Sequence, residues 1–497
     1  MSRHHYNTWT RVRAVLESPG LYELATGLDW DPPVGRPRAN PTYVVLGFGV
    51  LARLARSGIR VELDLAEPHT WAAVRQIMVA AIARHGLDLP PPGPRPPKWD
   101  HWRWMRDYVL ATDEGIADLG RLHPPIAVAA ARRLGLLDPA GPGSFTHPHP
   151  SRAVYGDGTL VRPMYRPPET VLLDNDDGTQ TPAYLDPATG ALHPEPRGRF
   201  DPDLQPHHGK GGSVRTHGYV CWHTRGPRPY QRIDLACGHT PAPGAEAATA
   251  VALLREVHRA AGTGIQAVVY DGALRGSHID QVMRDYGYPV LAKQATGTPE
   301  TDAGDHLEAV SLARTPQGRR VRTYPLGTAT HDLPTGPCTH QIATTGGQVV
   351  EIDLNEAGDP TIVATLVRRS VKRSRRANGR YRFNVGYELN CPASTFTIWL
   401  SPHATATDPS RPEQLRVLAP GDPDAQRLHG LRSDAEGFHS SFKRTLLVDR
   451  QMSLGWRRGL VDLYCFTLLN NALAEHRAAE EDRSGRMASP SALRGGG

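Results

Sequence analysis

Three acidic residues that lie far apart in the chain are the strongest candidates for chemistry. Asp157 and Asp271 each end an apolar stretch that reads as a β-strand, and a glycine follows each of them. Glu436 lies in a stretch with helical spacing. Two strand-end aspartates and one helical glutamate can converge on a pair of Mg²⁺ ions, because hard cations take oxygen ligands. Two such ions about 4 Å apart can activate an attacking water or hydroxyl and stabilise the leaving oxygen of a phosphodiester.

The stretch from residue 429 to 443 has two faces when its residues are placed about 100° apart, as in a helix. The apolar face can pack on a core and comprises Leu428, Leu431, Ala435, Phe438, Phe442 and Leu446. The charged face comprises His429, Arg432, Glu436, His439 and Lys443. On such a face the carboxylate can bind a metal ion while the cationic side chains beside it bind phosphates. The alternative is a surface helix with ordinary ion pairs.

The segments around the first two acids alternate between strands and helices. We predict strands at 152–161, 265–270 and 288–293, a hairpin formed by 214–224 and 230–237, and helices at 245–261 and 277–286. This order predicts an α/β layer with a mixed sheet. An Asp-Gly pair at a strand end is most often only a turn. Each acid alone is therefore weak evidence for a metal site, and the prediction depends on all three together.

Residues 296–425 break this alternation and read as a β-rich insertion. Strand candidates there are 319–324, 341–353, 360–373, 380–390 and 395–400, and Asn378-Gly379 is a strong hairpin turn. Eight basic residues surround that turn with no acid between them, namely Arg368, Arg369, Lys372, Arg373, Arg375, Arg376, Arg380 and Arg382. Such a run is often a solvated face, but this one suits a phosphate backbone better. We therefore predict that this segment, called the basic hairpin below, contacts nucleic acid.

The N-terminal 150 residues read as helical. Helices at 42–56 and 70–85 precede a stiff proline-rich linker at 89–98. A second helical group at 102–137 is expected to break near Pro124-Pro125. The end of that group is either half of a helix-turn-helix or part of a plain helical hairpin. A second linker covers 139–150, a helix at 456–477 should pack against the sheet, and the tail 484–497 is expected to be disordered.

The composition favours an anionic partner, because the 497 residues carry a formal net charge of +6. The 5 cysteines are widely spaced, which argues against a disulfide framework. Cys-x-His pairs leave zinc as an alternative to buried thiols and surface histidines, and they occur at Cys221/His223, Cys237/His239 and Cys338/His340. No apolar run is long enough to span a membrane, and the N-terminus lacks the apolar core of a signal peptide. We therefore expect a cytoplasmic protein without a membrane partner.

The acids and the charged face together resemble the DDE transposases of the insertion-sequence type, which have an RNase H-like catalytic core. The branch resembled carries its third carboxylate in a Tyr-x2-Arg-x3-Glu-x6-Lys signature, and this chain has Arg432, Glu436 and Lys443 at that spacing. His429 stands where the signature has tyrosine. The Asp-Gly-Thr at Asp157 and the β-rich insertion between the second aspartate and the glutamate are also similar to that branch. The resemblance covers residues 150–480.

This resemblance implies roles for the candidate residues. Asp157, Asp271 and Glu436 would ligate Mg²⁺, with Mn²⁺ as a substitute. His429, Arg432 and Lys443 would contact the DNA, together with the basic hairpin. The reaction implied is cleavage at the transposon ends to free a 3′-OH, which then attacks target DNA. We expect a homodimer that pairs two inverted-repeat ends of double-stranded DNA.

The predicted architecture is an RNase H-like α/β core with a mixed sheet, a β-rich insertion and an N-terminal helical region. Its expected parts are a DNA-binding helical region at 1–150, a catalytic core divided between 151–295 and 426–482, the insertion at 296–425 and the tail at 483–497. Two rival functions fit the same residues. One is a domesticated, non-catalytic DNA-binding relative, and the other is an RNase H-like nuclease that cuts without joining.

Overall fold

The chain forms two compact units. The computed structural model describes residues 8–28, 39–165, 169–175, 179–186, 189–195, 201, 203–209, 212–228, 231–292, 311–334, 336–356, 358–391, 394–446 and 450–483. Unit 1 comprises Met1–Leu136, Gly158–Ala261 and Glu436–Gly497, and unit 2 comprises Leu137–Asp157 and Gly262–Ala435. The expected disorder of residues 484–497 lies outside the described residues. Within them, no helix has both the length and the apolar character needed to cross a membrane.

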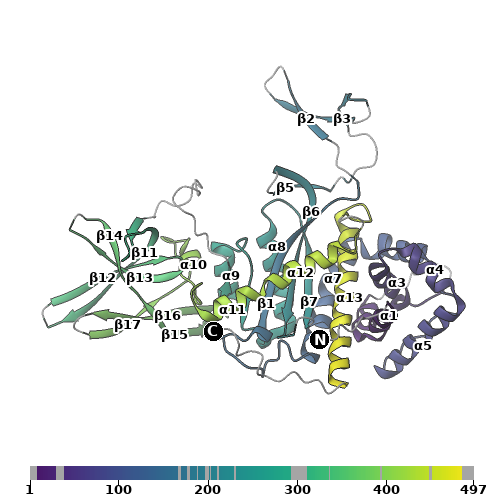
Figure 1. The fold of residues 1–497 in the computed structure, drawn as a ribbon, viewed down its shortest axis with the longest axis horizontal. Helices are drawn as coiled ribbons and strands as arrows, with labels where there is room; N and C mark the ends of the chain where they lie inside the picture. The colour runs from purple at the N-terminus through teal and green to yellow at the C-terminus, as the bar shows by residue number, and fades with distance from the viewer. Residues whose placement is uncertain are drawn as a thin grey trace. The chain divides into compact units, whose positions relative to one another are not determined.

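Unit 1 begins with a group of helices (Figure 1). They are α1 (Thr8–Glu17), α2 (Pro19–Gly27), α3 (Thr42–Ala55), α4 (Gly58–Ala66), α5 (Pro68–Arg84), α6 (Trp99–Met105) and α7 (Asp113–Arg133). The helices predicted at 42–56 and 70–85 are confirmed as α3 and α5. The proline-rich linker between α5 and α6 has neither helix nor strand. Side chains of the helices hold it, since Tyr43 Oη donates to Pro90 O at 2.8 Å and Trp71 Nε1 donates to Pro94 O at 3.1 Å.

The predicted break at Pro124-Pro125 is wrong, because α7 runs through both prolines. The helical group instead breaks after a π-helical turn at Arg106–Leu110. Thr112 then caps the start of α7 by accepting a hydrogen bond from Gly115 N at 3.0 Å. A proline inside a helix removes a backbone hydrogen bond. This loss is offset by packing around Pro124, which is buried whereas Pro125 is exposed, and by His123 Nε2, which donates to the Asp234 carbonyl at 3.1 Å.

The predicted hairpin in unit 1 is confirmed as two antiparallel strands flanked by helices. The elements are β5 (Gln205–Gly209), β6 (Gly212–Arg225), β7 (Arg232–Thr240), α8 (Glu246–Ala261) and α13 (Trp456–Arg483). β6 pairs with β7 and with β5, and α8 and α13 pack on β7. The prediction that the C-terminal helix packs on the sheet is therefore confirmed. A separate small sheet consists of β2 (Glu169–Asp174), β3 (Gln180–Leu185) and β4 (Leu192–His193).

The largest sheet is mixed, as predicted. Its parallel strands are β1 (Ala153–Val161), β8 (Ala267–Val269) and β9 (Val290–Leu291), with α9 (Gly276–Tyr286) between β8 and β9. The strand order is β5-β6-β1-β8-β9, and β7 pairs with β6. Since β5, β6 and β7 pair antiparallel, the sheet combines both orientations. The boundary between the units falls within β1, directly after Asp157.

The predicted β-rich insertion is a closed barrel followed by a three-stranded sheet, both in unit 2 (Figure 1). The barrel consists of β10 (Ser311–Arg314), β11 (Arg320–Leu333), β12 (Gly336–Thr345), β13 (Gln348–Leu354) and β14 (Pro360–Thr365). The sheet consists of β15 (Val367–Arg375), β16 (Tyr381–Cys391) and β17 (Ser394–Leu400). Ile342 of the barrel and Val385 and Leu389 of the sheet belong to one buried cluster. The barrel and the sheet are therefore packed on each other.

Two strands predicted for the insertion are wrong, because each is two strands. The stretch 341–353 contains Gly346-Gly347, whose φ angles of 54° and 78° suit glycine and reverse the chain between β12 and β13. The stretch 360–373 divides at Leu366, with β14 before it in the barrel and β15 after it in the sheet. The chain passes from the barrel to the sheet at a buried leucine. The sequence there contains no glycine, proline or other turn residue that would have indicated the end of a strand.

The helix predicted at 429–443 is also two helices. α10 (Arg411–Gln414) precedes α11 (Pro423–Leu431), and α12 (Ser433–Lys443) begins after Arg432. The predicted apolar face is buried, with Leu428, Ala435, Phe438, Phe442 and Leu446 all at most 6 % exposed. His439, which we placed on the charged face, is also buried, at 4 % exposed. Arg432 itself keeps helical φ and ψ angles of −61° and −27°, so the buried apolar face continues from α11 into α12 across the break.

Candidate active site

Asp157 and Asp271 lie at matching positions relative to two neighbouring parallel strands, β1 and β8. Each comes two residues after a directly paired residue, Tyr155 in β1 and Val269 in β8. Side chains alternate along a strand, so Asp157 faces the same side as Tyr155, whereas Asp271 lies two residues beyond Val269, the last residue of β8. Both of these apolar residues pack with Leu428 of α11 in one buried cluster. The strand alternation therefore directs the Asp157 carboxylate to the side of the sheet that α11 covers, and Asp271 follows the end of the neighbouring strand.

The prediction that Asp157 ends its strand is wrong, since β1 continues to Val161. Gly158 is part of that strand and not a turn. A Cβ at Gly158 would collide with the carboxylate of Glu246, the first residue of α8, so close approach explains the glycine. Glu246 is thus an acid beside Gly158 that the sequence did not single out. Its one sequence signal is its place at a helix start directly after the β6–β7 hairpin.

Asp271 follows its strand as predicted, and a turn begins there. Tyr270 N donates to Leu291 O at 2.9 Å, so backbone pairing continues up to the residue before the aspartate. Asp271 Oδ1 accepts a hydrogen bond from Ala273 N at 2.8 Å, which is the side-chain turn typical of aspartate. The paired strand on one side and the turn on the other fix the position of this carboxylate.

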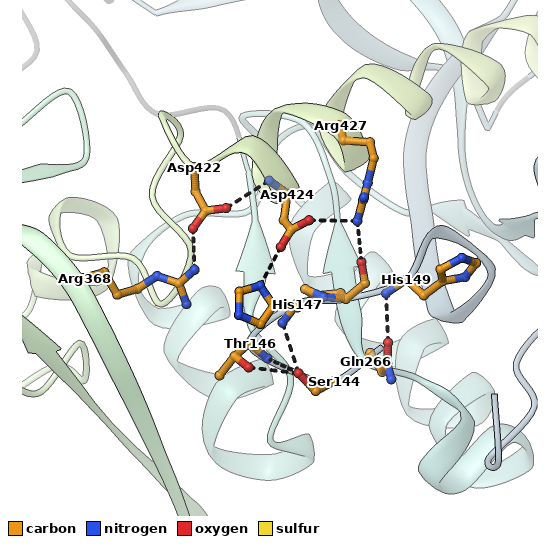
Figure 2. Close-up of polar contacts among 10 residues, drawn as sticks. Ser144, Thr146, His147, His149, Gln266, Arg368, Asp422, Asp424 and Arg427 are labelled. Carbon is orange, nitrogen blue, oxygen red and sulfur yellow. Dashed lines mark hydrogen bonds and ion pairs between the residues drawn. The ribbon is translucent and has the colours of Figure 1, made fainter. Parts of the chain in front are cut away.

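A network of polar contacts fixes the start of α11, the helix whose Leu428 packs with Tyr155 and Val269 (Figure 2). Asp422 caps the helix by accepting from Asp424 N at 2.9 Å, and it forms an ion pair with Arg368 of β15. Asp424 forms ion pairs with Arg427 at 2.8 Å and with His147 Nδ1 at 2.9 Å. The predicted linker at 139–150 and the basic hairpin are thus both tied to α11.

Arg432, directly after α11, pairs with the first aspartate. Its Nη1 lies 3.1 Å from Asp157 Oδ1, and the two side chains are 17 % and 10 % exposed. We predicted a DNA contact for Arg432, and the structure gives it a carboxylate partner. A metal ion at Asp157 would therefore compete with a cation that already contacts the same oxygen.

The other signature residues divide between the two units. His429 lies in α11 of unit 2 and is half-buried. Glu436 is exposed and Lys443 is half-buried, and both lie on the part of α12 that belongs to unit 1. α12 is held in unit 1 by Phe438, whose ring centroid lies 5.2 Å from that of Phe466 in α13. Two residues correspond to a rotation of about 200° around a helix, so Glu436 lies on nearly the opposite side of α12 from the packed Phe438.

The basic hairpin is less positive than its sequence indicates. Three of its arginines form ion pairs with acids that come from outside the run. These pairs join Arg368 to Asp422, Arg369 to Glu388 and Arg380 to Asp285. The Arg369 pair is two-pronged, with N–O distances of 2.7 and 2.8 Å. Such pairing reduces the positive charge that these arginines present to a phosphate.

The other cations of the basic hairpin lie on aromatic rings or remain exposed. Lys372 Nζ lies 4.0 Å from the centroid of Trp399, and the Arg373 guanidinium lies 4.3 Å from the centroid of Phe145. Arg375, Arg376 and Arg382 are exposed, and none of them forms an ion pair with an acid in the described part of the chain. The surface that best suits a phosphate backbone is therefore the turn end of the hairpin.

The Cys-x-His pairs on β6 and β7 do not assemble into a metal site. Cys221 lies directly opposite Cys237. Because the two strands run in opposite directions, His223 lies toward one end of the ladder from this cysteine pair and His239 toward the other end. The two histidines are therefore about four residues, or 14 Å, apart along the ladder. Burial lowers the pKa of His239 to about 4, and its ring stacks on Trp456 at 4.3 Å. These are buried thiols and neutral histidines of the unit 1 core.

No protein-family model matches the chain, and no curated protein gives a significant match to it. The site in unit 2 offers two carboxylates at corresponding positions relative to neighbouring parallel strands, and a cation paired with the first of them. Carboxylate oxygens set in this way suit hard divalent cations and the phosphate oxygens that such cations bind.

Proposed function

We propose that this chain is a DDE transposase that cuts transposon ends and joins the freed 3′-OH to target DNA. The observation that carries the proposal is that Asp157 and Asp271 each come two residues after a directly paired residue of two neighbouring parallel strands, Tyr155 and Val269. The resemblance of the signature around Glu436 supports it independently. An RNase H-like core, which this arrangement of acids would serve, is part of the same proposal.

The residues fit the Mg²⁺ that the proposal requires. Asp157 and Asp271 supply the hard oxygen ligands that Mg²⁺ takes in proteins, and Asp157 is only 7 % exposed, which restricts access of competing water. Glu436 would complete the set. When bound, the ions would activate the attacking oxygen and stabilise the leaving oxygen of a phosphodiester. Lys443 and the turn end of the basic hairpin would hold the DNA phosphates.

The proposal is tested with the full-length chain and double-stranded DNA that carries both inverted-repeat ends flanking its gene. Strand-specific end labels report nicking at the ends, and a supercoiled target plasmid reports joining. We expect both products with Mg²⁺ or Mn²⁺ and neither with EDTA. Cleavage without joined products would instead support a nuclease that does not transfer strands. Absence of both products, with the ends bound, would contradict the proposed chemistry.

A domesticated, non-catalytic DNA-binding relative is the second candidate, and one observation favours it. Arg432 already compensates the charge of Asp157 at 3.1 Å, so the carboxylate is accommodated without a metal ion. For this candidate, the chain binds the ends with equal affinity in Mg²⁺ and in EDTA and yields no cleavage. For a transposase, Mn²⁺ should bind to the free protein and compete with Arg432.

This competition makes a prediction for the Arg432→Gln variant. Removing the cation should tighten Mn²⁺ binding about fivefold, because a partly exposed ion pair is worth about 1 kcal/mol. Mn²⁺ affinity is measured by the decrease of the free-ion electron paramagnetic resonance signal. Arg444→Gln, at an exposed residue directly after α12, is the control and should leave the affinity unchanged. Equal or weaker binding by Arg432→Gln would show that the pair does not compete with the metal.

A further prediction concerns the basic hairpin. The Arg375→Gln/Arg376→Gln variant should weaken DNA binding and reduce the slope of log K against log salt by about two units, roughly 0.9 for each phosphate that is no longer neutralised. The matched control is Arg369→Gln, whose arginine is paired with Glu388 and should change the slope much less. Binding is measured by fluorescence anisotropy from low to moderate salt. An unchanged slope in the double variant would mean that the run is only a solvated face.

A further inference from the structure

Four side chains of unit 2 gather at one point between the barrel and the three-stranded sheet. They are His331 of β11, Cys338 and His340 of β12, and Cys391 at the end of β16. One ligand atom from each lies within 4.8 Å of all the others. Among the described residues, this is the one group of three or more such side chains that meets this criterion.

The distances within the group match the edges of a zinc tetrahedron. Zn–S bonds of about 2.3 Å and Zn–N bonds of about 2.0–2.1 Å give edges of about 3.8 Å between two sulfurs, 3.6 Å between sulfur and nitrogen and 3.4 Å between two nitrogens. Cys338 Sγ lies 3.8 Å from Cys391 Sγ and 3.4 Å from His340 Nε2. His340 Nε2 lies 3.4 Å from His331 Nε2. Both sulfurs and both Nε2 atoms are thus grouped around one point.

The strand register explains how the four side chains meet. His331 and Cys338 are directly opposite each other in the β11–β12 ladder. Cys338 and His340 are two residues apart on one strand, so they share a face. Cys391 comes from the other sheet. The group therefore spans the junction at which the barrel meets the sheet that carries the basic hairpin.

The surroundings prepare His340 as a metal ligand. His340 Nδ1 donates to the Glu351 carboxylate of β13 at 2.6 Å, which leaves Nε2 directed toward the group. A carboxylate behind a histidine is the usual second partner of a zinc-bound imidazole, because it fixes the tautomer and the ring orientation. The ring of Phe396 lies 4.2 Å from the centroid of His331 and gives the group an apolar cover.

We propose that His331, Cys338, His340 and Cys391 bind one structural Zn²⁺. Two cysteine thiolates and two neutral histidines form a closed four-ligand set with no position for substrate, which is typical of a structural site. Two thiolates also balance the charge of the ion. The bound ion would join the barrel to β16 and so hold the basic hairpin in place. This site is independent of the aspartates proposed to bind Mg²⁺.

The test is the metal content of the full-length chain, purified without a metal-affinity step and measured by inductively coupled plasma mass spectrometry. We expect about one zinc per chain, and less than about a tenth of that in Cys338→Ala and in Cys391→Ala. Cys465→Ala, which removes a buried cysteine of unit 1, is the matched control and should keep its zinc. Reconstitution with Co²⁺ should give the visible absorption of a tetrahedral thiolate site in the parent chain and not in the two variants.

A gentler variant keeps the test decisive if the cysteine variants fail to fold. Glu351→Gln leaves all four ligands in place and should weaken Zn²⁺ binding about 10- to 100-fold in a competition with a chromophoric chelator. The proposal is overturned if the parent chain contains no zinc and takes up neither Zn²⁺ nor Co²⁺ with its thiols reduced. It is also overturned if mass spectrometry of the untreated protein shows Cys338 and Cys391 joined in a disulfide.

Discussion

The Asp157→Asn variant should cleave the element ends at least about 10³-fold more slowly than the parent chain, and Asp271→Asn should do the same. A metal ion that stabilises the charge of the transition state contributes several kcal/mol, and each 1.4 kcal/mol is about tenfold in rate. Asparagine keeps the shape of aspartate but lacks the charge that holds the ion. Single-turnover cleavage of end-labelled DNA measures the effect.

Two controls separate this slower cleavage from damage to the fold. Asp174→Asn changes an exposed aspartate of β2 and should cleave like the parent chain. The Asp157→Asn/Arg432→Gln variant removes both members of the ion pair, and it should remain as slow as Asp157→Asn alone. If the double variant regained cleavage, the ion pair and not a metal site would explain the slower rate. If Asp157→Asn cleaved at nearly the parental rate, Asp157 would have no role in the reaction.

The parts of this site that the sequence predicted are those that depend on local pattern. Apolar runs with strand character located β1 and β8, and each aspartate comes two residues after a directly paired residue of these strands. Helical spacing likewise identified the buried face of α11 and α12 through Leu428 and Phe438. Local patterns carry this information because burial of one face is a property of each element by itself.

The parts that were not predicted depend on residues far apart in the chain. The break at Arg432 accompanies its hydrogen bond to Asp157, which is 275 residues away. The charge of the basic hairpin is reduced by acids that the fold supplies, such as Asp422, which is 54 residues from its partner. Cys391 joins His331 only after two sheets have packed together. No spacing rule connects such residues, so only the packed structure reveals them.

A buried ion pair in the core of unit 1 gives the largest predicted effect on stability. Arg53 of α3 and Asp462 of α13 are 1 % and 0 % exposed, and Arg53 Nη1 lies 3.5 Å from Asp462 Oδ2. Ser453 Oγ donates to the same oxygen at 3.3 Å. The Arg53→Met variant fills similar space but leaves the carboxylate in the core without this counter-charge. Breaking such a pair costs about 3–5 kcal/mol.

In thermal unfolding, this cost should lower the midpoint of unit 1 by about 6–20 °C, at about 2–4 °C for each kcal/mol. The exposed pair between Arg60 and Asp64 provides the control, because both side chains are at least 50 % exposed and Arg60→Met should cost less than about 1 kcal/mol. The Arg53→Met/Asp462→Leu variant should recover most of the stability, since an apolar pair can replace a buried ion pair. If the double variant were as unstable as Arg53→Met, poorer packing around residue 53 would be the cause. The result also bears on the site, because α13 carries both Asp462 and the Phe466 ring that holds α12 in place.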